Sequence, residues 1–322
     1  ASDAFARLYP KSKDTPAILF KAARTWYDHG RLKRAGQRFG RVITGHPKDR
    51  YAALSGALAL DSYSRLKDWP EVVKWARTLI TNRNFKHYKR SQLRSIIAAS
   101  GIKAAAILEK RGKFAEAALA MKAVHDEFPR DENATRALFN TAVLFEKAGQ
   151  SDRALSTYRQ VRKKARRSTF AARATFVLGA LYEGRADFKR AARYYGEMAR
   201  MAKIKETPDA LYNASVMHEA LGNARAAEKI RRQYVKLYPK RPDATRAFFS
   251  IGKLLESQKK WGAAEKFYLA FVKRPAAKAH PTLVVAAWTR AGRAVRRSRR
   301  GKSARGQKRA LAHFRKAVAA YR

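Results

Sequence analysis

Histidine and cysteine often carry nucleophilic catalysis and metal binding in proteins, but here their spacing supports neither. The chain has no cysteine, so it offers no thiol nucleophile and no thiolate ligand. Its seven histidines are scattered, and none forms a His-x-x-x-His or Glu-x-x-His pair that would place two ligands on one helical face. His218 is expected at the edge of a core. Glycine-rich phosphate loops are absent. The sequence therefore predicts a protein that is not an enzyme and has no catalytic residue, metal site or cofactor.

Basic residues could bind polyanions. The chain has 72 Lys and Arg against 25 Asp and Glu, a formal net charge of +47, which is far more than solubility requires. The predicted polyanion contacts are two clusters, Arg162, Lys163, Lys164, Arg166 and Arg167, and Arg296, Arg297, Arg299, Arg300, Lys302 and Arg305. The ligand would be RNA, DNA, or an anionic polymer or lipid of a cell envelope. A solvated face is the alternative interpretation of each cluster.

Glycines near these charges give two further expectations. The second cluster is expected to be a mobile loop, because like charges repel and Gly301 and Gly306 offer no packing. Glycines 36, 40, 196 and 262 are expected to face outward from helices, where each costs about 0.8–1 kcal/mol relative to alanine. That pattern indicates a surface from which acids have been removed.

A repeated phrase indicates the elements that position these residues. It reads Gly-x-aromatic-x-x-Ala at residues 112–117, and small residues that align with its last position recur along the chain. Most successive recurrences are 36 or 37 residues apart, a period typical of helical-repeat arrays. Apolar residues within each unit recur at helical spacing, for example at Leu138, Ala142 and Phe145. The sequence therefore predicts an all-α stack of about eight helix-turn-helix units.

The units form one predicted array behind a short lead-in of residues 1–13, which is expected to be loosely held. They are placed roughly at residues 14–47, 48–84, 89–130, 132–167, 169–204, 207–240, 243–276 and 281–322.

Two units carry a known signature. The best copies are Leu19, Ala22, Ala23, Trp26, Ala35, Phe39 and Pro47, and Phe248, Ile251, Gly252, Leu255, Ala264, Tyr268 and Phe271. In these residues the chain resembles the tetratricopeptide repeat (TPR) family, with a period nearer 37 than the usual 34. The longer period is similar to that of TPR proteins of the bacterial envelope. The resemblance implies a right-handed α-solenoid and a scaffold for protein-protein interaction, in the periplasm or at the envelope, with the cytoplasm as the alternative.

In the TPR family the first helices of the repeats line a groove, and here two of their positions are repeated. The fifth position is aromatic, at Phe139, Phe176, Tyr212 and Phe249, and the twelfth is Glu146, Glu183, Glu219 and Glu256. This pattern predicts a groove for a peptide that carries Lys or Arg. The alternative interpretations are that the aromatics pack between adjacent first helices and that the glutamates pair with Arg136, Arg173 or Arg246.

The partners expected from the sequence are therefore proteins or peptides, or else nucleic acid or another anionic polymer, without an indication of the oligomeric state. No stretch of eighteen apolar residues predicts a transmembrane segment. The chain starts at Ala1 without Met, which is consistent with a trimmed precursor.

Overall fold

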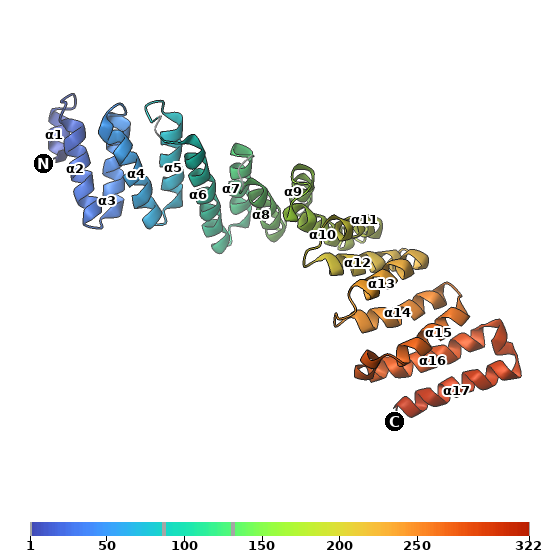
Figure 1. The fold of residues 1–322 in the computed structure, drawn as a ribbon. Coiled ribbons are helices and arrows are strands. Elements are labelled where there is room, and N and C mark those ends of the chain that lie inside the picture. Colours follow the sequence, from blue (N-terminus) through green and yellow to red (C-terminus); the bar gives the residue numbers. More distant parts are fainter. Residues whose placement is uncertain (1, 86–87, 130–132, 322) are drawn as a thin grey trace. The chain divides into compact units, whose positions relative to one another are not determined.

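The computed structural model describes residues 2–85, 88–129 and 133–321, apart from the side chain of Arg300. In these residues all regular secondary structure is helical, which confirms the predicted all-α class (Figure 1). Contacts divide the chain into two compact units, Ala1–Val161 and Arg162–Arg322. The division falls inside helix α9 (Ser151–Lys164).

Helix hairpins make up the first compact unit. A short helix α1 (Ser2–Leu8) is followed by the pairs α2 (Thr15–Asp28) and α3 (Leu32–Gly45), α4 (Arg50–Arg65) and α5 (Trp69–Thr81), α6 (Arg90–Lys110) and α7 (Phe114–Glu127), and α8 (Ala134–Lys147) and α9. Most of these helices pack on the next one in the chain, within a hairpin and between hairpins. We call the two members of each pair its first and second helix.

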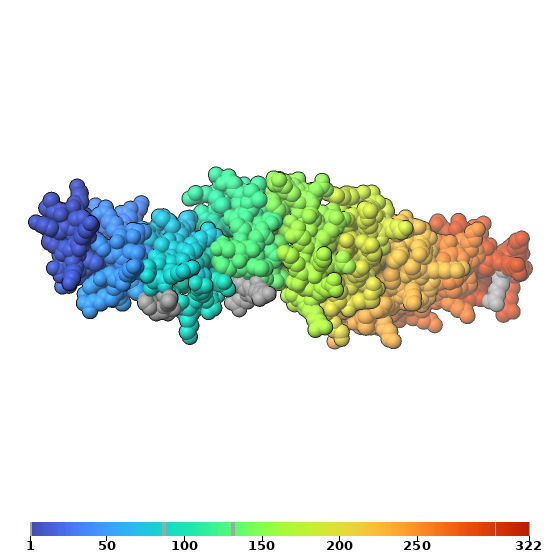
Figure 2. Space-filling view, turned by 90° about the horizontal axis from the view of Figure 1, so that it is seen from above, coloured from blue at the N-terminus to red at the C-terminus, as the bar shows by residue number. Residues whose placement is uncertain are grey.

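The second compact unit has the same construction. Its pairs are α10 (Thr169–Glu183) and α11 (Phe188–Met201), α12 (Thr207–Ala220) and α13 (Ala224–Leu237), α14 (Ala244–Ser257) and α15 (Trp261–Val272), and α16 (Pro281–Arg297) and α17 (Ala304–Tyr321). Two 3₁₀ helices, η1 (Pro275–Ala279) and η2 (Arg299–Lys302), lie before and after α16. Within this unit each hairpin packs against the next one in the chain (Figure 2).

The turn inside most hairpins needs one residue with a left-handed backbone. Glycine supplies it at positions 30, 112, 149 and 222, where φ is 70–73°, and this confirms the turn signals in the sequence. At Gly149 the next amide, Gln150 N, donates to Phe145 O at 2.9 Å and closes the end of α8. Lys67, Ala186 and Lys259 adopt φ of 56–58° in three other hairpins, although residues of these types do not favour that conformation.

Helices within a hairpin approach closely where a ring lies over a glycine. A Cβ atom on Gly179 would lie 2.7 Å from the Tyr195 ring, and one on Gly252 would lie 2.5 Å from the Tyr268 ring. Both tyrosines are buried, at 1% and 0% exposure. The small residue and the large ring are therefore complementary halves of one contact.

Two of the four glycines expected to face outward are in fact buried. Gly36 and Gly40 lie beneath the rings of Tyr63 and Trp75 from the following hairpin, so a Cβ at either position would overlap a ring. The outward expectation is wrong for this pair, which is there for packing. Gly262 has no neighbour within 4 Å of such a Cβ, and Gly196 has only Arg200 at 3.7 Å, as expected.

The lead-in contains the helix α1, and an acid ties this helix to the first hairpin. Asp3 accepts hydrogen bonds from Arg38 at 2.7 Å and from Arg41 at 3.0 Å, both on α3. The Asp3 side chain is 28% exposed, so these pairs are partly shielded from solvent. These ion pairs join α1 to α3, although none of the residues of α1 is buried.

The basic segment after α16 is folded as η2. Gly301 is buried against the carbonyl oxygens of Val295 and Arg296, and its amide donates to Ser298 O at 3.0 Å. Gly306 is buried as well, one turn into α17. The expectation that these glycines offer no packing is wrong, because both are buried and Gly301 permits a close approach that a side chain would block.

A carboxylate connects α13 to α14 in the second unit. Asp243 accepts hydrogen bonds from Tyr234 Oη at 2.7 Å and from Arg241 Nε at 3.2 Å. Partial burial of the Asp243 carboxyl opposes its ionisation, but the hydrogen bonds from Tyr234 and Arg241 outweigh this and hold its pKa below the usual value. Its contribution to stability is therefore complete above the unfolded carboxyl pKa of about 4 and is lost as the pH falls through the lower, folded pKa.

Replacing Asp243 by asparagine should consequently destabilise the protein by about 1 kcal/mol at pH 7, a modest value because the side chain is 39% exposed. The difference from wild type should begin to shrink as the pH falls below about 4 and should vanish once the folded carboxyl, whose pKa is lower, is protonated too. Urea unfolding at several pH values measures it, with Asp126→Asn as the control at a half-exposed acid. A difference that stays constant down to pH 2 would contradict the account.

Candidate functional site

The four glutamates predicted to line the groove are each held by a donor from the same hairpin or the next. Tyr158 Oη donates to Glu146 at 3.1 Å, and Tyr195 Oη donates to Glu183 at 2.6 Å. Arg231 donates to Glu219 at 2.8 Å, and Arg290 donates to Glu256 at 2.7 Å. The first three donors lie twelve residues after their glutamate, on the second helix of the same hairpin. The repeated glutamate thus fastens the first helix to the second.

Two of the three arginines expected as alternative partners pair with other residues. Arg136 donates to Asn133 at 2.9 Å, and Arg173 pairs with Glu206 at 3.5 Å. The four glutamates accept hydrogen bonds from residues on other helices instead. Residue spacing within one helix could not predict those contacts.

The donors divide the glutamates into two kinds. Burial, together with the hydrogen bond to the Glu183 carboxylate, raises the pKa of Tyr195 and keeps the phenol neutral. Burial raises the pKa of Tyr158 in the same way beside Glu146. The donors of Glu183 and Glu146 are therefore uncharged, whereas Glu219 and Glu256 are paired with the guanidinium groups of Arg231 and Arg290.

The four predicted groove aromatics contact the second helix of their own hairpin. Ring centroids lie 5.6 Å apart for Phe139 and Tyr158, 5.5 Å for Phe176 and Tyr195, 5.3 Å for Tyr212 and Tyr234, and 5.4 Å for Phe249 and Tyr268. Phe139, Phe176 and Tyr212 are half-buried, and Phe249 is buried. These contacts differ from the expected packing between adjacent first helices. The three half-buried rings keep some surface for a ligand.

Arg231 is a residue that the sequence analysis missed. Its side chain is 2% exposed and donates to Ser215 at 3.2 Å, to Ser250 at 3.0 Å and to Glu219, with its guanidinium 5.5 Å from the Tyr212 ring. It occupies the place that tyrosine has in the hairpins of α8, α10 and α14. An arginine at a position that is tyrosine in three other hairpins was the feature of the sequence that could have pointed to this residue.

A pocket of about 460 Å³ brings two predicted glutamates together in the second unit. Glu219 of α12 and Glu256 of α14 line it, along with Lys253, Arg290 and Arg297. Its charge is mixed, since both glutamates already have arginine partners.

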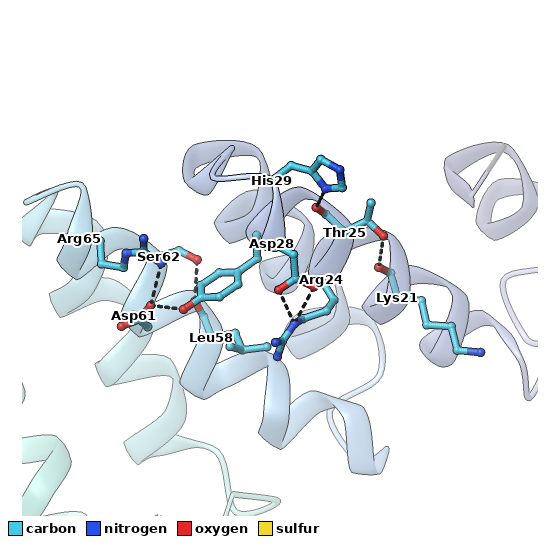
Figure 3. A network of polar contacts seen from close by, with 10 residues as sticks. Lys21, Arg24, Thr25, Asp28, His29, Leu58, Asp61, Ser62 and Arg65 are labelled. Atoms are coloured by element: carbon cyan, nitrogen blue, oxygen red, sulfur yellow. Dashed lines mark hydrogen bonds and ion pairs between the residues drawn. The ribbon is translucent and has the colours of Figure 1, made fainter.

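The first unit presents a different arrangement on its first helices, which no sequence pattern had indicated. Tyr27 on α2 donates from its hydroxyl to Asp61 on α4 at 2.5 Å (Figure 3). The guanidinium groups of Arg24 and Arg65 lie 5.5 and 5.6 Å from the Tyr27 ring. Arg24 also pairs with Asp28 at 2.8 Å, so acids and bases balance each other here.

The first basic cluster contains both paired and exposed members. Arg162 donates to Glu197 at 2.7 Å and lies 5.3 Å from the Tyr194 ring. Lys163, Lys164, Arg166 and Arg167 are exposed.

The second basic cluster faces in more than one direction. Arg296, Arg297, Arg299, Lys302 and Arg305 are exposed, while the side chain of Arg300 lies outside the described residues. Arg297 lies over the Trp261 ring at 5.3 Å, whereas Arg299 and Arg305 line a separate cavity.

Two of the described histidines are buried and contact a polar neighbour. His125 is buried with Nδ1 3.1 Å from Ala134 O, and His313 is buried with Nε2 2.9 Å from Glu265 Oε1. His218 is half-buried. Within the described ranges there is no group of three His, Cys, Asp or Glu side chains suited to a metal ion. In the same ranges no helix combines the length and the apolar character needed to cross a bilayer.

Comparisons with known proteins agree with the repeat architecture. The sequence model of the tetratricopeptide repeat matches residues 136–168, which run from α8 through α9, so the resemblance inferred from the sequence is confirmed for this hairpin. No curated protein matches the sequence.

Three solved structures are similar to this chain at low sequence identity. The crystal structure of MamA is 18% identical, covering 56% of this chain and 93% of that one, with a TM-score of 0.44. YrrB, described as a TPR protein with an unusual peptide-binding site, is 18% identical over 62% of this chain and 93% of its own, with a TM-score of 0.42. The C-terminal part of a TPR repeat-containing protein from Cytophaga hutchinsonii is 11% identical in sequence. The match covers 94% of this chain and 99% of that one, with a TM-score of 0.43.

Proposed function

We propose that this protein is a non-enzymatic repeat scaffold that holds a basic segment of a partner protein on the first helices of its second compact unit. We call this surface the acidic face and define it by Phe176, Glu183, Tyr212, Glu219 and Glu256. The observation that carries the proposal is the fixed carboxylate of Glu183, which a neutral phenol holds at 2.6 Å without cancelling its charge.

The charge of the whole protein strengthens this argument. Because the protein has a net charge of +47, most of its surface repels a cationic peptide. A carboxylate without a cationic partner is therefore a favourable place for such a peptide to bind. A carboxylate that is already oriented also loses little side-chain entropy on binding. The half-buried rings of Phe176 and Tyr212 offer apolar contact for the aliphatic part of lysine.

The distance between packed helices sets the spacing of lysines in a suitable test peptide. Packed helices lie about 8–10 Å apart, and three residues of extended chain span about 10 Å. A peptide with lysine at every third position is therefore a suitable test ligand, and its counterpart with glutamine in place of lysine is the matched peptide control.

The proposal predicts a graded effect of removing charge. Glutamine retains a hydrogen-bond acceptor for Tyr195, so Glu183→Gln should lower peptide affinity by about tenfold and leave the fold intact. Glu219→Gln and Glu256→Gln should each cost less than about threefold, because arginines already neutralise those carboxylates. Glu116→Gln on α7 is the control, with a side chain 57% exposed and outside the face. Isothermal titration calorimetry gives the constants, and equal effects at all four positions would refute the proposed role of Glu183.

Polyanion binding is a second candidate, favoured by the exposed cations Lys163, Lys164, Arg166 and Arg167. The same variants separate the two functions by sign. Removing the negative charge at Glu183 should lower the affinity for a cationic peptide. The affinity for a single-stranded nucleic acid should stay the same or rise slightly.

A further inference from the structure

A second cavity in the second compact unit is lined by basic side chains. It has a volume of about 750 Å³ and lies among α15, α16, η2 and the start of α17. Lys266, Arg299, Arg305 and Arg309 line it together with the carboxylate of Glu265. Arg299, Arg305 and Arg309 follow one another near the end of the chain, and the fold places Lys266 of α15 beside them.

The acid that lines this cavity, Glu265, already has partners. Glu265 is the last acidic residue of the chain and is 7% exposed. Its Oε1 accepts from Arg309 at 2.7 Å and lies 2.9 Å from His313 Nε2. The carboxylate therefore fixes Arg309 at the wall of the cavity and has no further charge to offer to Lys266, Arg299 or Arg305.

The remaining three cations have no counterion in the described residues, and all three are exposed. They surround one cavity, so their charges repel one another unless an anion is present. The start of α17 adds to the same field. Ser303 Oγ accepts from Gly306 N at 3.1 Å, and the aligned amides of this 18-residue helix favour negative charge at its first turn.

We propose that this cavity is a discrete binding site for a small multivalent phosphate, which we call the phosphate pocket. Arginine forks give bidentate contacts to phosphate oxygens, and lysine adds a point charge. Many cations of this chain lack a counterion, but these three line one cavity together with Arg309, which Glu265 holds in place. It is independent of the acidic face, and it differs from a polyanion track because it would bind one ligand per chain.

Inorganic tripolyphosphate is the probe, titrated into the full-length protein by calorimetry at about 0.15 M salt. Wild type should bind one equivalent. Arg299→Ala with Arg305→Ala should lose at least tenfold in affinity, since each lost charge-assisted contact is worth about that much. Arg166→Ala with Arg167→Ala removes the same charge from exposed positions outside the pocket and should change affinity by less than about twofold.

Three results would overturn the phosphate pocket. They are no binding to wild type, equal losses in the two double variants, and a stoichiometry well above one, which would indicate general condensation of anions on a basic surface. Vesicles carrying a polyphosphorylated headgroup, compared with neutral vesicles, show whether a lipid can supply the same group. The Arg299→Ala, Arg305→Ala protein should still bind the lysine peptide, so failure of the pocket and failure of the acidic face are distinguishable.

Discussion

Replacing Tyr268 by alanine is expected to lower the free energy of unfolding of the second compact unit by about 3–5 kcal/mol. The ring is 0% exposed, its centroid lies 5.4 Å from that of Phe249, and it covers Gly252 so closely that the two helices have no other way to fill the space. Truncation would leave a cavity between α14 and α15. Hydrogen exchange of the amides in these helices measures the loss within the intact protein.

The hydroxyl of the same residue gives the sharper comparison. The Tyr268 hydroxyl is buried and makes no hydrogen bond of normal geometry in the described part of the chain, although it lies close to Glu256 and Arg290, so Tyr268→Phe should change stability by less than about 1 kcal/mol. Tyr195→Phe should instead cost about 1 kcal/mol, because it removes the bond to Glu183. Tyr321→Ala, at 83% exposure, is the control for truncating an exposed ring. A loss below 1 kcal/mol for Tyr268→Ala would contradict the packing described.

Arg231→Ala is the second large effect, with an expected loss of about 2–3 kcal/mol. Breaking a buried ion pair costs about 3–5 kcal/mol, but the Glu219 side chain is 42% exposed, so water can solvate part of the charge left behind. The hydroxyls of Ser215 and Ser250 also lose a donor. Urea unfolding of the full-length protein measures the change.

A double variant tests whether this arginine substitutes for the usual tyrosine. In the hairpin of α8 and α9, Ala142, Glu146 and Tyr158 take the places of Ser215, Glu219 and Arg231. Ser215→Ala with Arg231→Tyr recreates that combination and should retain stability to within about 1 kcal/mol. If the double variant is as unstable as Arg231→Ala, the hairpins are not interchangeable at this position.

The helical repeat could be predicted because it depends on local features. Apolar spacing predicted the all-α class, and glycine at positions such as 149 marked turns that need a left-handed residue. Ala186 and Lys259 adopt the same backbone with no preference for it, and only the surrounding hairpin imposes that conformation.

What the sequence could not provide is the partner of each side chain across the helix layers. Gly36 and Gly40 look exposed within their own helix, and only the rings of the following hairpin explain them. Four similar glutamates proved to differ in available charge, because two face tyrosines and two face arginines. In the phosphate pocket, Arg299 and Arg305 already belonged to one predicted basic cluster, but only the fold places Lys266 of α15 beside them.

Zero-length carbodiimide crosslinking of the lysine peptide to the protein, mapped by mass spectrometry, tests the acidic face most directly. It joins an ammonium group to a carboxylate only where the two are in contact. The account predicts a principal crosslink at Glu183, lost in Glu183→Gln. Crosslinks distributed over exposed acids such as Glu116 and Asp126, with none at Glu183, would contradict it.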